Sequence, residues 1–177
     1  MSTQLKGSIR LAGVVRESIV DGPGIRFTVF TQGCPHHCPG CHNPQTHDPA
    51  GGYDCEMQKI LDAVEKNPLL RGITLSGGEP FEQPEQLLEL AKAVVAMGKD
   101  VVAFSGYTFE QLVSGTPEQK ALLEEIDVLI DGPFLLAEKS LEISFRGSRN
   151  QRILDVRQSL AQGRAVNIQS GRWQGEY

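Results

Sequence analysis

The stretch IRFTVFTQGCPHHCPGCH, residues 25–42, governs how the rest of this 177-residue chain is interpreted. Residues 25–31 are rich in β-branched and aromatic side chains and predict a strand. A polar loop of about 25 residues, rich in Gly and Pro, follows, and so long a loop in a compact domain is usually functional. Its first part, residues 33–42, is called the cysteine loop below. It carries Cys34, Cys38 and Cys41 with the spacing C-x-x-x-C-x-x-C.

Strand and helix patterns alternate on the carboxyl side of this stretch. Apolar side chains at helical spacing predict helices over residues 56–67 and 84–97, and Pro84 suits a first helical turn. Strands are expected over 72–76, 100–105, 127–130 and 151–156, and shorter helices over 109–113, 117–125 and, after the last strand, to residue 162. Strands that alternate with helices favour parallel βαβ units. The expected fold class is therefore α/β, a partial (β/α) barrel of five or six parallel strands, with an open doubly wound sheet as the alternative.

The length and charge of the chain limit its domain number and its classes of partner. The chain fits one domain at roughly 150 residues per domain, and it is too short for a complete barrel of about 250 residues. We expect a single domain over residues 1–177, with a core over 13–156 and a C-terminal helix and tail over 157–177. With 17 basic and 22 acidic residues, the net charge of −5 argues against a nucleic-acid partner.

Neither a membrane span nor a signal peptide is expected. No apolar run approaches the roughly 18–20 residues that a span requires, and the first residues lack an uninterrupted apolar core. We therefore expect a cytoplasmic protein that does not associate with membranes. The cytoplasm keeps thiols reduced, so the four cysteines are expected to bind metal or to act in catalysis.

Four segments with unusual composition each follow an expected strand. They are the cysteine loop, SGGEP at 76–80, SGY at 105–107 and DGPF at 131–134. The carboxyl ends of parallel strands meet at one edge of a sheet, and that edge carries the active site in barrels and in open sheets. We therefore expect these segments to build one site.

Three closely spaced cysteines can hold a metal centre of two kinds. A cubane iron–sulfur cluster normally takes four cysteines, so three would leave one iron open to an external ligand. The alternative is a zinc site, which would need a fourth ligand from Cys55, His36, His37, His42 or His47. The absence of a second C-x-x-C pair disfavours zinc.

The cysteine loop resembles the signature of the radical S-adenosylmethionine (SAM) enzymes. Three segments are similar to those of glycyl-radical-enzyme activating proteins: SIVDGPGIR at 18–26, HNP at 42–44 and SGGEP at 76–80. Three more look like those of activating proteins for the anaerobic (class III) ribonucleoside-triphosphate reductase: SGY at 105–107, DGPF at 131–134 and RGSRNQ at 146–151. The resemblance runs from about residue 13 to residue 156.

This resemblance implies a [4Fe-4S] cluster in which Cys34, Cys38 and Cys41 bind three irons and SAM chelates the fourth. One electron from the cluster would break the S–C5′ bond of SAM, giving methionine and a 5′-deoxyadenosyl radical. That radical would take a Cα hydrogen from one glycine of a large partner enzyme, the anaerobic ribonucleotide reductase. A reduced flavodoxin-type protein is the implied electron donor.

The resemblance also implies which residues contact SAM. The backbone of Gly40, Cys41 and His42 would lie along the adenine, Gly77 and Gly78 beside the methionine moiety, and Glu79 near its ammonium group. Ser105 and Asp131 are further candidates, although Ser105 could instead cap a strand and Asp131 could belong to a plain turn. No catalytic residue is expected beyond the cluster ligands. Cys55 is expected outside the site as a half-buried thiol, and His36 and His37 are expected as exposed loop residues near the cluster.

Several alternatives remain open at this point. The chain could activate another glycyl radical enzyme, or act on a small molecule as a deazapurine-forming synthase does, or be a metal-binding module without catalysis. A basic C-terminal segment adds a further hypothesis. Six arginines and one aspartate lie between residues 145 and 175, so this segment could dock on the partner, or Arg146 or Arg149 could meet the SAM carboxylate.

Overall fold

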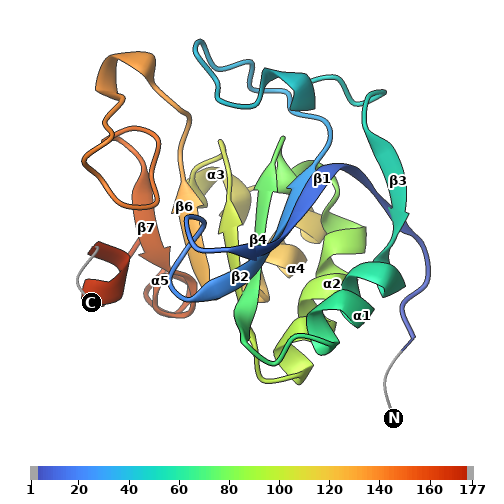
Figure 1. Ribbon diagram of the computed structural model, residues 1–177. Helices are drawn as coiled ribbons and strands as arrows, with labels where there is room; N and C mark the ends of the chain where they lie inside the picture. Colours follow the sequence, from blue (N-terminus) through green and yellow to red (C-terminus); the bar gives the residue numbers. More distant parts are fainter. Residues whose placement is uncertain (1–3, 175–177) are drawn as a thin grey trace.

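The computed structural model describes residues 4–174 and contains one sheet of seven strands in the order β3-β1-β2-β4-β5-β6-β7 (Figure 1). The strands are β1 (Ser8–Ser18), β2 (Ile25–Thr31), β3 (Tyr53–Glu56), β4 (Leu70–Gly77), β5 (Asp100–Phe104), β6 (Val128–Asp131) and β7 (Arg152–Asp155). The α-helices are α1 (Met57–Glu65), α2 (Pro84–Ala96), α3 (Phe109–Val113), α4 (Pro117–Glu124) and α5 (Val156–Gln162). Short 3-10 helices are η1 (Pro44–Thr46), η2 (Pro80–Glu82), η3 (Leu136–Glu138) and η4 (Gly171–Gln174).

The sheet is mixed, so the expectation of five or six parallel strands was wrong. Only β2, β4, β5 and β6 pair in parallel, whereas β1, β3 and β7 pair antiparallel with their neighbours. The connections explain the difference. Only residues 19–24 join β1 to β2, and a parallel pairing needs a crossover of about a dozen residues or more. The segment 132–151 contains no α-helix and stays at the end of the sheet where β6 finishes, so β7 returns antiparallel (Figure 1).

The helices pack on one face of the sheet. Alternate sheet residues, among them Phe27, Val29, Ile73 and Leu75, form one apolar core with buried side chains from all five α-helices. Leu90 of α2 is typical, since none of its surface is exposed. The doubly wound alternative, with helices on both faces, does not match this arrangement.

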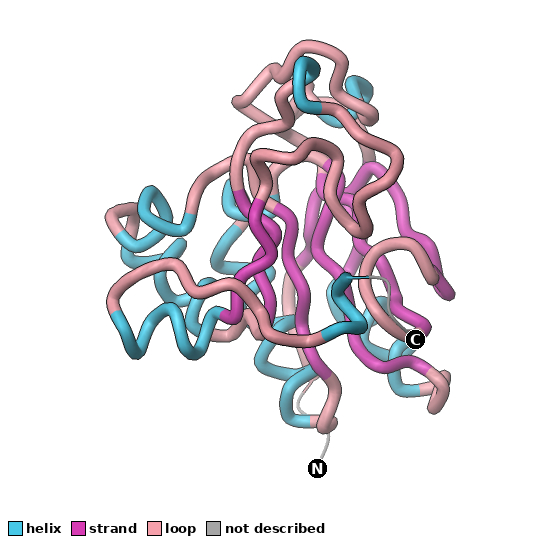
Figure 2. Tube along the Cα trace, turned by 90° about the vertical axis from the view of Figure 1, so that its left-hand side faces the viewer, coloured by secondary structure: helices cyan, strands magenta, loops and turns pink. Residues whose placement is uncertain are grey.

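The opposite face of the sheet is called the open face below. It is polar over β2 and β4, where Arg26, Thr28 and Thr74 are fully buried. Over β5 and β6 it is apolar, and Val102 and Ile130 pack there in a small cluster with Trp173. Long loops gather above one end of the strands, as Figure 2 shows. These loops follow the carboxyl ends of β2 and β6, and this end is called the carboxyl edge.

Local patterns located most of the central elements. The strand at 25–31 has the bounds expected, and α2 ends one residue before the predicted end. Two strands were not predicted, β1 and the edge strand β3. Within residues 4–174, no helix has the length and apolar character needed to cross a membrane.

Candidate functional site

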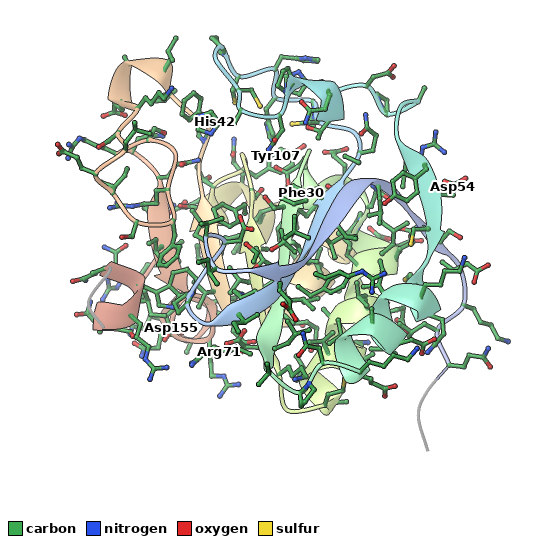
Figure 3. The ribbon with its side chains drawn as sticks, in the orientation of Figure 1. Phe30, His42, Asp54, Arg71, Tyr107 and Asp155 are labelled. Atoms are coloured by element: carbon green, nitrogen blue, oxygen red, sulfur yellow. The ribbon has the colours of Figure 1, made fainter. Side chains whose placement is uncertain are left out.

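A cavity of about 370 Å³ opens at the carboxyl edge between the sheet and the overlying loops. Seven of the predicted site residues line it: Cys34, Cys38, Cys41, His42, Gly77, Gly78 and Ser105. Figure 3 places His42 under the upper loops with Tyr107 near the strand ends below, whereas Arg71 and Asp155 lie toward the other end of the sheet. The expected convergence of the strand-end segments is therefore present.

The cysteine loop is held in shape by its own main chain. The N–H groups of Gly33 and Cys34 donate to the carbonyls of Thr46 and His47, at 2.7 and 3.1 Å. The N–H of Cys41 donates to the carbonyl of Cys38 at 3.1 Å, which makes a tight turn between these two thiols. The loop therefore curls back on itself, and all three sulfur-bearing residues line the cavity.

The thiols form no disulfide, and Cys34 resists ionisation. All four cysteines are free. Burial raises the pKa of the Cys34 thiol to about 11, and the charges of Glu79, Cys38 and Cys41 act in the same direction. A cationic metal centre would reverse this effect, because it stabilises thiolates.

The residues present fit a multi-iron cluster better than a single ion. A zinc ion needs four ligand atoms at about 2.0–2.3 Å from one point. Within residues 4–174, no three His, Cys, Asp or Glu side chains converge closely enough to hold one ion. Cys34, Cys38 and Cys41 line one cavity, and three cysteines would leave one iron of a [4Fe-4S] cluster open to an external ligand.

Gly77 and Gly78 pack tightly against the start of the cysteine loop. A Cβ on Gly77 would lie 2.4 Å from the main-chain nitrogen of Thr31, and one on Gly78 would lie 2.4 Å from the carbonyl oxygen of Gly33. The N–H of Gly78 donates to the Thr31 carbonyl at 2.8 Å. These glycines therefore join the ends of β2 and β4 while leaving backbone exposed to the cavity.

Glu79 is fully buried and does not itself line the cavity. Its carboxylate accepts hydrogen bonds from Ser105 Oγ at 2.9 and 3.0 Å, from Gly106 N–H at 2.8 Å and from Phe81 N–H at 3.1 Å. His36 Nε2 lies 2.6 Å from Glu79 Oε1. Protein groups thus surround the carboxylate, and a contact from Glu79 to SAM stays a prediction.

Two other predicted residues lie outside the cavity lining. Asp131 is buried and binds Arg152, with Oδ2 2.6 Å from Nη2, and it accepts a hydrogen bond from the N–H of Phe109 at 2.7 Å. Asp131 therefore links β6 to β7 and to the start of α3. Gly40 lies next to Leu136 of the segment after β6. The roles of Asp131 and Gly40 toward SAM stay predictions.

The structure adds residues that sequence reasoning missed. His36, expected as an exposed loop residue, has a side chain only 17% exposed because it contacts Glu79. Phe134 lines the cavity, and its ring centre lies 5.1 Å from that of His42. Gln151 also lines it. Arg146, one of the two arginines expected to meet the SAM carboxylate, lines it too, whereas Arg149 does not.

The arginine-rich segment is partly neutralised in space. Arg152 pairs with both Asp131 and Glu110, and Arg149 lies 3.7 Å from Glu142. Arg152 consequently lowers the pKa of Glu110 through a hydrogen bond. The excess of positive charge counted along the sequence is therefore smaller on the folded surface.

Comparison with known proteins identifies the family. Residues 20–154 match the model of the family described as "4Fe-4S single cluster domain". An anaerobic ribonucleoside-triphosphate reductase-activating protein from Vibrio cholerae is 38% identical over 141 residues, which cover 75% of this chain and 89% of that protein. The chain belongs to the family of anaerobic ribonucleoside-triphosphate reductase-activating proteins, as the motifs predicted.

Further relatives carry the same name. The protein from Escherichia coli K12 is 35% identical over 148 residues, covering 78% of this chain and 94% of its own length. The protein from Enterobacteria phage T4 is 34% identical over 142 residues, covering 76% and 86%. The crystal structure of QueE from Escherichia coli aligns with 58% of this chain and 54% of its own, at 17% identity and a TM-score of 0.44.

Proposed function

We propose that this chain is an activating enzyme that uses a [4Fe-4S] cluster and SAM to install a glycyl radical on an anaerobic ribonucleoside-triphosphate reductase. One observation carries the proposal: the three cysteines and the Gly77–Gly78 backbone line the same cavity at the carboxyl edge. Relatives that share most of their length with this chain bear the corresponding name.

Cys34, Cys38 and Cys41 are the residues that would hold the cluster. His42, Gly77, Gly78 and Ser105 line the space left for SAM. Cluster and SAM together would supply one-electron reductive cleavage and the removal of a hydrogen atom from glycine. The protein's part is to bind both groups, to orient them and to keep water away from them.

The carboxyl edge gives the partner access. Ile19 and Val20 are 70% and 71% exposed, and Val20 also lines the cavity. Exposed apolar side chains beside a cavity suit a protein substrate whose glycine-bearing segment must enter it. With helices on one face only, we interpret the fold as a partial barrel, in one domain, that leaves its interior open to this segment.

The electron donor is a reduced flavodoxin-type protein, and the setting is the cytoplasm.

A radical-transfer experiment tests the proposal. The reconstituted protein is mixed under anaerobic conditions with SAM, a reductant and the anaerobic reductase, and the glycyl radical is measured by electron paramagnetic resonance. A radical doublet is expected with the wild type and with the control variant Cys55→Ala, because Cys55 lies on β3 outside the cavity lining. No doublet is expected with Cys38→Ala. Absence of the doublet from the wild type, although SAM is consumed, would contradict this choice of partner.

A further inference from the structure

We propose that His36 is a positioning residue that fixes the cysteine loop to the buried Glu79 before any cluster is bound. The use of this loop for a [4Fe-4S] cluster rests on the proposed function, whereas the contact itself belongs to the protein alone. His36 lies between Cys34 and Cys38, so fixing its ring fixes the backbone that carries both thiols.

Glu79 is a rigid anchor for this contact. Its side chain is 0% exposed, and three donors besides His36 hold it: Ser105 Oγ, Gly106 N–H and Phe81 N–H. Phe81 lies in the turn after β4, and Ser105 and Gly106 follow β5. The carboxylate therefore already joins two strand ends. His36 adds the end of β2 to this junction.

The contact from His36 has good hydrogen-bond geometry. Its Nε2 lies 2.6 Å from Glu79 Oε1, which also accepts from Ser105 Oγ and Gly106 N–H, and the ring donates in the tautomer that carries its proton on Nε2. The ring also packs edge-on against Tyr107, with ring centres 4.5 Å apart, and the Tyr107 hydroxyl donates to Glu82. Hydrogen bonds to charged groups are among the strong ones in proteins, so this one can hold a loop.

Gly106 leaves the space that the ring occupies. A Cβ at this position would lie 2.4 Å from Cδ2 of His36, so any larger residue would displace the ring. The φ angle of Gly106 is not in the left-handed region, and alanine is therefore compatible with its backbone. Gly106→Ala thus breaks the contact from the other side without changing any residue of the cysteine loop.

His37 provides a matched control in the same loop. It is exposed, and its ring packs edge-on against His47 with ring centres 5.3 Å apart. Like His36, it lies between Cys34 and Cys38. The two histidines differ in that His36 contacts Glu79, whereas His37 makes no such contact and has a φ angle of 49°.

Amide hydrogen exchange in the metal-free protein tests the inference without any cluster. His36→Ala is expected to speed exchange of the hydrogen-bonded amides of Cys34 and Cys41 about tenfold, a factor equivalent to about 1.4 kcal/mol. Gly106→Ala should give a similar increase, and the double variant should add little, because both changes remove one interaction. His37→Ala should leave the rates unchanged. Equal rates in His36→Ala and His37→Ala would overturn the proposal.

Iron release from the reconstituted protein tests whether the His36–Glu79 contact also helps to retain the cluster. A chelator should remove iron about tenfold faster from His36→Ala than from His37→Ala, and His36→Gln should restore much of the difference because its amide can donate to Glu79. Equal release rates in the three variants would overturn the inference while leaving the activating function intact. If the wild type bound no iron, the proposed function would fail, and the exchange experiment would still decide the role of His36.

Discussion

The two faces of the sheet are stabilised in different ways, although adjacent residues of the same strands supply both faces. On the covered face, Phe27 and Val29 pack into a continuous apolar core under the helices. On the open face, Arg26 and Thr28 are equally buried but polar. Arg26 donates to Thr74 Oγ1 at 2.7 Å and to the Ile73 carbonyl at 2.8 Å, and it pairs with Asp100.

This difference between apolar packing and hydrogen bonding shows which face contributes most to stability and which face forms the functional cavity. An apolar core fills space, because close-packed side chains maximise contact and exclude water. The buried polar side chains of the open face are held by hydrogen bonds instead, because buried polar groups need partners. The open face therefore supports a cavity at the carboxyl edge, while the covered face supplies most of the free energy of folding.

The largest stability effect is expected from the covered face. Leu90→Ala removes a fully buried side chain from α2 and should lower the free energy of unfolding by about 2–5 kcal/mol. Urea denaturation measures this change. Iron bound per folded chain should stay at the wild-type level, and a loss of less than about 1 kcal/mol would show that this face does not dominate stability.

A smaller effect is expected from the polar network of the open face. Arg26→Met leaves Asp100 without its buried partner and should cost about 2–3 kcal/mol, below the 3–5 kcal/mol of a fully buried pair, because the Asp100 side chain is 31% exposed. Arg71→Met is the control, since Arg71 binds the same carboxylate from an exposed position and should cost less than about 1 kcal/mol. If urea denaturation gave the same loss of unfolding free energy for Arg26→Met and Arg71→Met, the distinction between the buried and the exposed arginine would be wrong.

The reactivity of the Cys34 thiol shows how its environment in the cavity differs from that of a cysteine in solvent. The raised pKa of Cys34, about 11, lies two units above the usual value of 9.0. Alkylation of Cys34 in the metal-free protein at pH 8 should be about tenfold slower than that of an ordinary cysteine, because a roughly hundredfold loss of thiolate is offset by a roughly tenfold gain in nucleophilicity. Mass spectrometry of iodoacetamide-treated protein measures this rate. Alkylation of Cys34 as fast as that of a model peptide would contradict the burial of its thiol.

The smallest effect concerns the exposed ion pair near β7. Arg152 holds the pKa of Glu110 below its ordinary value of 4.5, so the pair stabilises the fold above pH 4.5 and loses this contribution as the pH falls through the lowered pKa. Glu110→Gln should cost at most about 1 kcal/mol at pH 7, because the side chain is mostly exposed. The difference between variant and wild type should vanish in acid, and one that grew there would refute this sign.

Sequence patterns located the covered face well because they depend on local periodicity. Four apolar positions of α2, Leu87, Leu90, Ala91 and Val94, are buried as their spacing predicts. β1 was missed because Gly13 and a run of exposed residues interrupt its alternation. The direction of β7 depends on the path of the preceding loop, which no local pattern encodes.

The site shows the same division. The cysteine spacing and the two glycines identified the cavity residues, because their chemistry is specific to a cluster and to close backbone approach. His36 was missed because its partner Glu79 lies 43 residues away and only the fold brings them together. Asp131 follows the expected strand, but its carboxylate binds Arg152 from a strand 21 residues away.

Cluster assembly coupled to SAM cleavage tests the central claim most directly. The protein is reconstituted anaerobically with iron and sulfide and reduced in the presence of SAM, and then iron and 5′-deoxyadenosine are quantified. We predict about four irons per chain and deoxyadenosine formation in the wild type and in Cys55→Ala, with both lost in Cys38→Ala. Zinc in place of iron, or a cluster that leaves SAM intact, would contradict the assignment of this cavity to a radical SAM activating enzyme.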